Sequence, residues 1–257
     1  MSRIAKVADV TADSLIRHVT ALSRAGEFIR TGGMNSERAL RAVVFDLDGL
    51  MFNTEELYFE VGGELLRRRG KQVTRELLDQ MMGRQARQAL QIMIDWHGLD
   101  DTVETLQRDN DEIFAGLLQT RLAPMPGLLD LLAALEAAGI PKAIGTSSRR
   151  KFVDTALNRF NLALRFQFIL TAENITQGKP HPEIYLTAAE RFGLRPAEVL
   201  VLEDSQNGCR AAVAAGTFAV AVPGDHSRAH DFTGASLIAI GLYDERIYAA
   251  LGLQQVR

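Results

Sequence analysis

Short apolar runs alternate with longer stretches of helical periodicity over most of this chain, and this alternation restricts the possible fold more than any other feature. The runs span residues 42–45, 142–145, 168–171, 199–202 and 218–222. Each has the length of a buried strand. From residue 142 onward, helical patterns over 152–160, 184–192 and 209–215 separate the runs. Repeated strand–helix units of this kind predict an α/β fold, with a doubly wound parallel sheet covered on both faces.

Residues 55–124 depart from the alternation, because their apolar residues recur at helical spacing without a convincing strand. We expect an all-helical cap domain here, inserted into a sheet domain made of residues 41–54 and 125–257, with hinges at 52–54 and 123–127. Residues 1–40 predict an N-terminal helical extension. It either packs on the body or serves oligomerisation or docking, and Met34 is an alternative natural start.

Composition and charge exclude several classes of partner. With 29 basic and 32 acidic residues the net charge is −3, so no global positive charge exists to hold nucleic acid or an anionic membrane. No apolar run approaches the roughly 18 residues that span a bilayer. The single cysteine forms no internal disulfide, which fits a reducing compartment. We therefore expect a cytoplasmic monomer or homodimer that binds neither nucleic acid nor membrane.

Carboxylates directly follow two of the predicted strands. Asp46 and Asp48 follow residues 42–45, and Glu203 and Asp204 follow residues 199–202. Ligands of open parallel sheets bind beyond the carboxyl ends of the strands, so these side chains should converge. A lone aspartate there is most simply a cap or a turn residue. Four converging carboxylates would repel one another unless a cation neutralised them, and an all-oxygen site suits Mg²⁺.

Two further segments carry groups that suit an anion. Thr146, Ser147 and Ser148 follow the strand at 142–145, and their hydroxyls and backbone N–H groups would cradle an anion, although small polar residues also cap helices at such places. Lys179 stands between Gly178 and a proline, just ahead of a helix. A surface lysine is normally solvated. Beside a magnesium ion and an anion cradle, its fixed positive charge would hold phosphate oxygens.

Taken in order, Asp46-Leu47-Asp48-Gly49, Thr146, Lys179-Pro180 and Glu203-Asp204 resemble the four sequence motifs of the haloacid dehalogenase-like hydrolase superfamily. Segments 178–185 and 202–208 are most similar to its β-phosphoglucomutase-like branch. The resemblance covers about residues 42–225. It implies a Rossmann-like core, a helical cap in the long separation between the first two motifs, and a Mg²⁺-dependent phosphatase that hydrolyses a small phosphorylated metabolite.

The resemblance also implies a role for each motif residue. Asp46 would be the nucleophile that forms an aspartyl-phosphate, and Asp48 would protonate the leaving oxygen and then activate water. Thr146 and Lys179 would stabilise the phosphate oxygens. Mg²⁺ would be held by Asp46, the main-chain carbonyl of Asp48, Glu203 and Asp204.

Asp48 favours phosphoryl transfer over dehalogenation, because a halide needs no proton to leave. The mutases of this branch carry a histidine and an arginine in the cap where this chain has Tyr58 and Ala86. This difference favours a phosphatase. A phosphohexomutase, and a non-catalytic phosphate-binding or scaffold protein, remain the alternatives.

Candidate substrate-binding residues lie mainly in the predicted cap. They are Glu55, Tyr58, Arg84 and Arg87, together with Ser147 of the core. Glu55 directly follows Thr54 and so lies close to the catalytic loop. For the two arginines a solvated helix face is the alternative.

Other reactive side chains support simpler interpretations. His226 and His230 stand four residues apart with acidic neighbours, a spacing that zinc ligands also show, but a solvated loop is the simpler interpretation. Cys209 begins an alanine-rich helical pattern and is expected to be a small buried packing residue.

Overall fold

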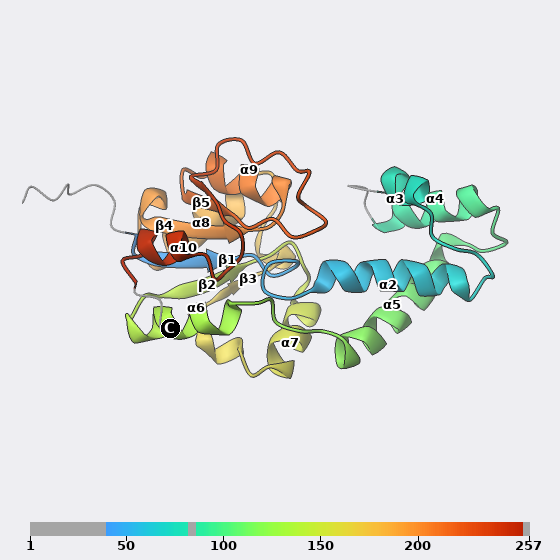
Figure 1. Cartoon of the computed structure of the whole chain (residues 1–257), viewed down its shortest axis with the longest axis horizontal. Coiled ribbons are helices and arrows are strands. Elements are labelled where there is room, and N and C mark those ends of the chain that lie inside the picture. The colour runs from blue at the N-terminus through green and yellow to red at the C-terminus, as the bar shows by residue number, and fades with distance from the viewer. Residues whose placement is uncertain (1–39, 82–85, 254–257) are drawn as a thin grey trace, which may run out of the picture. The chain divides into compact units, whose positions relative to one another are not determined.

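The computed structural model describes residues 40–81 and 86–253, and the predicted helix in the N-terminal extension lies outside them. The described residues contain a parallel six-stranded sheet with the order β3-β2-β1-β4-β5-β6 (Figure 1). Its strands are β1 (Ala42–Phe45), β2 (Lys142–Gly145), β3 (Ile169–Leu170), β4 (Val199–Glu203), β5 (Phe218–Ala221) and β6 (Leu237–Ile238). The doubly wound α/β fold predicted from the strand–helix alternation is confirmed.

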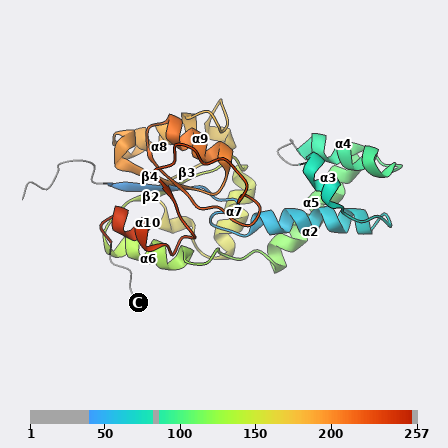
Figure 2. The same cartoon turned by 45° about the horizontal axis from the view of Figure 1, so that its top comes forward.

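Helices cover both faces of the sheet because every strand residue of β1 is apolar and buried. Val43 and Phe45 pack into one hydrophobic layer, and Ala42 and Val44 pack into the other. The first layer includes α6 (Leu128–Ala137), α7 (Arg150–Arg159) and α10 (Glu245–Ala250), and the second includes α8 (Glu183–Phe192) and α9 (Gln206–Ala214). Figure 2 shows α8 and α9 together on one side of the sheet and α6 on the other.

Between β1 and α6 the described residues form four helices. They are α2 (Thr54–Arg67), α3 (Arg75–Met81), α4 (Ala86–His97) and α5 (Val103–Thr120). They share a hydrophobic cluster of their own, and Arg69, two residues after the end of α2, pairs with Asp101 and Asp109 at 2.7 Å each. We call this segment, residues 54–123, the helical insertion. The domain boundaries stated above remain a prediction.

Asn53 links the two segments that enter and leave the helical insertion. Its Oδ1 accepts a hydrogen bond from Ala123 N at 2.8 Å, and its Nδ2 donates to Arg121 O at 3.3 Å. Its backbone N–H also donates to Ala123 O. The two predicted hinge segments are therefore hydrogen-bonded to each other.

The five predicted strands are present with small shifts of their ends, and β6 and α10 are additional. β6 has two residues and α10 has six, too few for a periodic pattern to stand out in the sequence. The helix expected to begin at Cys209 begins instead at Gln206, because the Ser205 side chain accepts from Gly208 N and caps it. Three 3₁₀ turns complete the described elements, η1 (Ala163–Arg165), η2 (Ala172–Asn174) and η3 (Pro196–Glu198). Among the described residues, every helix is too short or too polar to cross a membrane.

Candidate active site

The four predicted carboxylates gather where the strand order reverses. β1 lies between β2 and β4, and Phe45 of β1 is in register with Leu202 of β4. Asp46 N donates to Leu202 O at 3.0 Å, so the residues that follow these two strands start side by side. In open α/β sheets this reversal opens the crevice in which ligands bind.

Lys179 joins the two acidic pairs. Its ammonium donates to Asp46 Oδ1 at 2.5 Å, to Glu203 Oε1 at 2.6 Å and to Gly145 O at 2.9 Å. Burial disfavours the ammonium, but the charges of Asp46 and Glu203 outweigh it and raise the pKa of Lys179 well above its ordinary value. Lys179 is therefore a fixed positive charge between the two carboxylates.

The loop that carries Lys179 is tied to the start of α8. The Glu183 carboxylate accepts from the backbone N–H groups of Thr176 and Gln177, both at 2.7 Å. The Lys179–Pro180 peptide bond is cis. The side chain of Lys179 is 6% exposed, so the ammonium is held inside the protein and not on its surface.

Glu203 is the most extensively hydrogen-bonded carboxylate of the site. Besides Lys179, the hydroxyl of Tyr185 donates to Oε1 at 2.6 Å, and the hydroxyl and backbone N–H of Ser205 donate to Oε2 at 3.0 and 3.3 Å. Gly208 lies against this carboxylate, because a Cβ at that position would overlap both of its oxygens. Glu203 is 1% exposed, so these hydrogen bonds take the place of water around its carboxylate.

Asp48 has one oxygen bound and one free. Ser148 Oγ donates to Oδ2 at 2.6 Å, and the Thr146 hydroxyl approaches the same oxygen at 3.4 Å. In the described part of the chain, Oδ1 is buried and has no hydrogen-bond partner. Burial raises the pKa of Asp48, and the Ser148 hydrogen bond partly opposes this shift. A carboxyl group with a raised pKa and a free oxygen suits general acid–base chemistry.

The turn after β1 requires glycine at position 49. Gly49 has a φ of 72°, and a Cβ there would overlap the Asp204 carboxylate. Its N–H donates to Thr54 Oγ1 at 2.9 Å, which connects the turn to the first residue of α2. The close approach of backbone and carboxylate is possible only without a side chain.

The donor set fits a hard divalent cation. Asp46, Glu203 and Asp204 each offer an oxygen within 4.8 Å of the others, and all three are buried. Burial raises the pKa of Asp46 to about 8, against the effect of Lys179, and burial together with Glu203 raises that of Asp204 well above its ordinary value. One ammonium does not balance these carboxylates. A cation that prefers oxygen ligands, such as Mg²⁺, would do so.

The predicted substrate-binding residues do not all reach this site. Glu55 lies close to the turn, since its Cγ is 3.1 Å from where a Cβ of Gly49 would be, and burial, then repulsion by Asp48, raises its pKa. Tyr58 stacks on Phe114 with centroids 4.8 Å apart. Desolvation and the charges of Asp48 and Glu55 raise the pKa of its hydroxyl.

The remaining candidates are placed differently. Arg87 is exposed and pairs with Glu104 inside the helical insertion, so the structure does not bring it to the carboxylates. Arg84 lies outside the described residues. Ser147 is exposed, whereas its neighbour Ser148 is the residue that bonds to Asp48.

A hollow adjoins the carboxylates. Its volume is about 230 Å³, and Gly49, Glu55 and Asp204 line it together with residues from 222–228 and 240–243. It therefore extends from the turn after β1 toward the loop that follows β5.

Three residues of the site were given no individual role from the sequence. Ser148 is one of three small polar residues after β2, and spacing alone does not tell which of them reaches Asp48. Tyr185 is part of a helical pattern and reads as an apolar core residue. Gly208 directly precedes the helical pattern at 209–215, so only the structure places it inside α9 and against the Glu203 carboxylate.

Cys209 lies in α9, and His226 and His230 lie in the loop after β5. Cys209 is buried in α9, and burial raises the pKa of its thiol to about 11. His230 Nδ1 accepts from Gln206 N at 3.4 Å. His226 stacks on Phe59 and lines the hollow. In the described part of the chain, the side chains close enough together to share a metal ion are Asp46, Glu203 and Asp204, and neither histidine is one of them.

Comparisons with known proteins agree with this site. Residues 43–222 match the haloacid dehalogenase-like hydrolase family. A phosphorylated carbohydrates phosphatase of Thermotoga maritima is 32% identical over 69% of this chain and 82% of its own length, and (DL)-glycerol-3-phosphatase 2 of Arabidopsis thaliana is 33% identical over 70% and 78%. A Thermotoga maritima crystal structure, provisionally designated β-phosphoglucomutase, superposes with a TM-score of 0.71 at 28% identity, over 82% of this chain and 97% of that one. The chain therefore belongs to the haloacid dehalogenase-like hydrolases, in their β-phosphoglucomutase-like branch, and is an enzyme of that hydrolase family.

Proposed function

We propose that the protein is a Mg²⁺-dependent phosphatase that hydrolyses a small phosphorylated metabolite, such as a sugar or polyol phosphate, through an aspartyl-phosphate. One observation carries the proposal. Asp46 is paired with Lys179, while Asp48, two residues later, keeps a buried oxygen that accepts no hydrogen bond from the described residues. A nucleophile beside a fixed positive charge, next to a carboxyl group with a free oxygen, is what two-step phosphoryl transfer requires.

In the first step a carboxylate oxygen of Asp46 attacks phosphorus, and the bond from phosphorus to the alcohol oxygen breaks. Asp48 gives its proton to that oxygen, for which its raised pKa keeps the proton available. In the second step Asp48 takes a proton from water, whose oxygen displaces the Asp46 carboxylate from phosphorus. Phosphate leaves, and both carboxyl groups return to their starting states.

Lys179 and Thr146 would hold the oxygens of the transferred group, since both lie at the edge where Asp46 and Asp48 meet. Asp46, Asp204 and the main-chain carbonyl of Asp48 would hold Mg²⁺. The oxygens of Glu203 already accept hydrogen bonds from Lys179, Tyr185 and Ser205, so Glu203 would contribute mainly negative charge. The bound ion would neutralise the repulsion between an anionic nucleophile and an anionic phosphate.

The named activities of the relatives support this class of substrate, because they act on phosphorylated carbohydrates and on glycerol 3-phosphate. The second candidate is a phosphohexomutase, because the chain is similar to a structure designated as a β-phosphoglucomutase. In that reaction the phosphoryl group on Asp46 would pass to a sugar hydroxyl instead of water. The two functions differ in their products and can be separated directly.

The test is phosphate release from a panel of sugar phosphates, glycerol phosphates, phosphoglycolate and nucleoside monophosphates, with Mg²⁺ and with EDTA. Release that needs Mg²⁺ and is concentrated on one class of ester supports the proposal. Interconversion of hexose phosphate isomers with little release would favour the mutase. No turnover of any ester would favour a binding protein.

Two variants test the assignment of roles. Asp46→Asn should remove turnover, and activity above roughly a few per cent of wild type would contradict the assignment of Asp46 as the nucleophile. Asp48→Asn should lose far more activity on an alkyl phosphate than on an aryl phosphate, whose leaving group needs little protonation. Equal losses on the two would exclude the acid role.

A further inference from the structure

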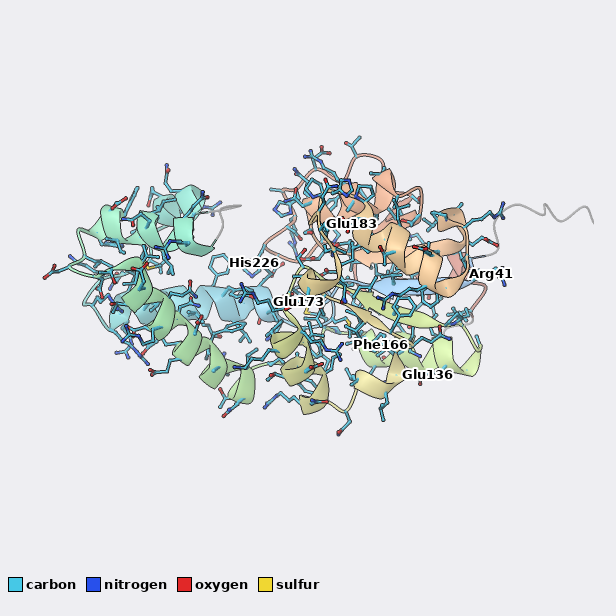
Figure 3. All side chains as sticks on the ribbon, turned by 180° about the vertical axis from the view of Figure 1, so that it is seen from behind. Arg41, Glu136, Phe166, Glu173, Glu183 and His226 are labelled. Atoms are coloured by element: carbon cyan, nitrogen blue, oxygen red, sulfur yellow. The ribbon has the colours of Figure 1, made fainter. Side chains whose placement is uncertain are left out.

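His226 connects the loop after β5 to the helical insertion. Its ring stacks on Phe59 of α2 with centroids 4.5 Å apart and planes 22° apart. Figure 3 labels His226 in this position beside α2. Stacking on a second ring restrains the plane of the imidazole and so limits the directions in which its ring nitrogens can point.

The loop that carries His226 is anchored to β4, the strand that ends at Glu203. Val222 N donates to Glu203 O at 2.7 Å, and Gly224 N donates to Ser227 Oγ at 3.0 Å. Asp225 and Arg228, on either side, pair with each other at 2.7 Å. The backbone that carries His226 is thus held from within the loop and from β4.

His226 and Glu55 line the same hollow from different elements, with Asp204 and Gly49 on its catalytic side. Burial and then Asp48 raise the pKa of the Glu55 carboxyl, and His226 partly lowers it. A carboxylate accepts hydrogen bonds, and an imidazole both donates and accepts. Together they offer what neighbouring hydroxyl groups require.

We propose that His226 is a specificity-determining residue, whose ring, held against Phe59, hydrogen-bonds to a hydroxyl group of the leaving alcohol beside Glu55. The ligand class is the phosphate monoester of a polyhydroxy alcohol. The inference deepens the proposed phosphatase function and rests on it for the catalytic test. His226→Phe keeps the stacked ring and removes both nitrogens, so it separates recognition from simple packing.

The catalytic test compares kcat/KM for glucose 6-phosphate and glycerol 3-phosphate with kcat/KM for p-nitrophenyl phosphate, whose leaving group carries no other hydroxyl. His226→Phe should lower the ratio of hydroxylated to aryl ester about ten-fold, the value of one hydrogen bond. Trp96→Leu, which removes a half-exposed aromatic residue of α4, is the control and should leave the ratio unchanged. If His226→Phe leaves this ratio unchanged, including the case in which kcat/KM falls equally on both kinds of ester, the proposal is overturned.

A binding measurement separates this inference from the phosphatase function. Calorimetry with Asp46→Asn, alone and combined with His226→Phe, gives Kd for glucose 6-phosphate, glycerol 3-phosphate and inorganic phosphate without turnover. The second substitution should weaken one of the two esters about ten-fold and leave inorganic phosphate within two-fold. This result in a protein that hydrolyses no ester would reject the phosphatase and keep the role of His226. Equal weakening of all three, or of none, would reject the role of His226.

Discussion

Gly208 offers a direct test of how the Glu203 carboxylate is held. Alanine at this position would place its Cβ inside the volume of both carboxylate oxygens of Glu203, a residue that is 1% exposed. The carboxylate would have to move away from Lys179, Tyr185 and Ser205. The substitution therefore breaks the site without changing any charge.

The expected change in the free energy of unfolding of Gly208→Ala is the sum of two opposing contributions. Alanine is favoured over glycine inside a helix by about 1 kcal/mol. A buried charge that loses its partners costs about 3–5 kcal/mol. The free energy of unfolding of Gly208→Ala should therefore fall by about 2–4 kcal/mol, and phosphate release should be lost even below the unfolding temperature.

Gly63→Ala is the matched control. Gly63 also lies inside a helix, α2, but nothing is within 4 Å of the position of its Cβ. This variant should be about 0.5–1 kcal/mol more stable than wild type. The assay is urea unfolding followed by circular dichroism, with phosphate release as the second readout. A Gly208→Ala protein as stable and active as Gly63→Ala would refute the account of Glu203.

Two further predictions concern titrating groups. In EDTA the free energy of unfolding should decrease as pH rises from about 5 to about 8. Asp46 has its pKa raised from 3.8 to about 8, and the pKa values of Asp48 and Asp204 are also raised, so the folded protein binds more protons than the unfolded one over this range. For each extra proton that the folded protein binds relative to the unfolded one, the free energy of unfolding falls by about 1.4 kcal/mol per unit rise in pH. Mg²⁺ should flatten this dependence, and denaturant melts showing stability that is constant or rises with pH in EDTA would contradict the crowding of the carboxylates. The Cys209 thiol, buried and with its pKa raised to about 11, should react with a disulfide reagent at pH 8 far more slowly in the native protein than in urea, and labelling at equal rates would exclude its burial.

The sheet and the motif carboxylates were predictable because both depend on local sequence. A buried parallel strand reads as a short apolar run, and residues directly after such runs meet at one edge of the sheet. Asp46 and Glu203 follow β1 and the apolar run of β4, which are neighbours in register, so their proximity follows from position alone. Arg87 shows the limit of this reasoning, because its helical position did not reveal that Glu104 is its partner.

By itself the sequence determined that this is an α/β chain with an all-helical segment after its first strand, and that two acidic pairs, a lysine and small hydroxyl residues follow its strands. Only the tertiary structure decided which of those groups touch. Ser148 and not Ser147 bonds to Asp48, Tyr185 reaches Glu203 from α8, and His226 meets Phe59 across 167 residues of chain. Such contacts join side chains from separate elements, so they depend on helix packing and on the course of a loop, which periodicity and spacing do not encode.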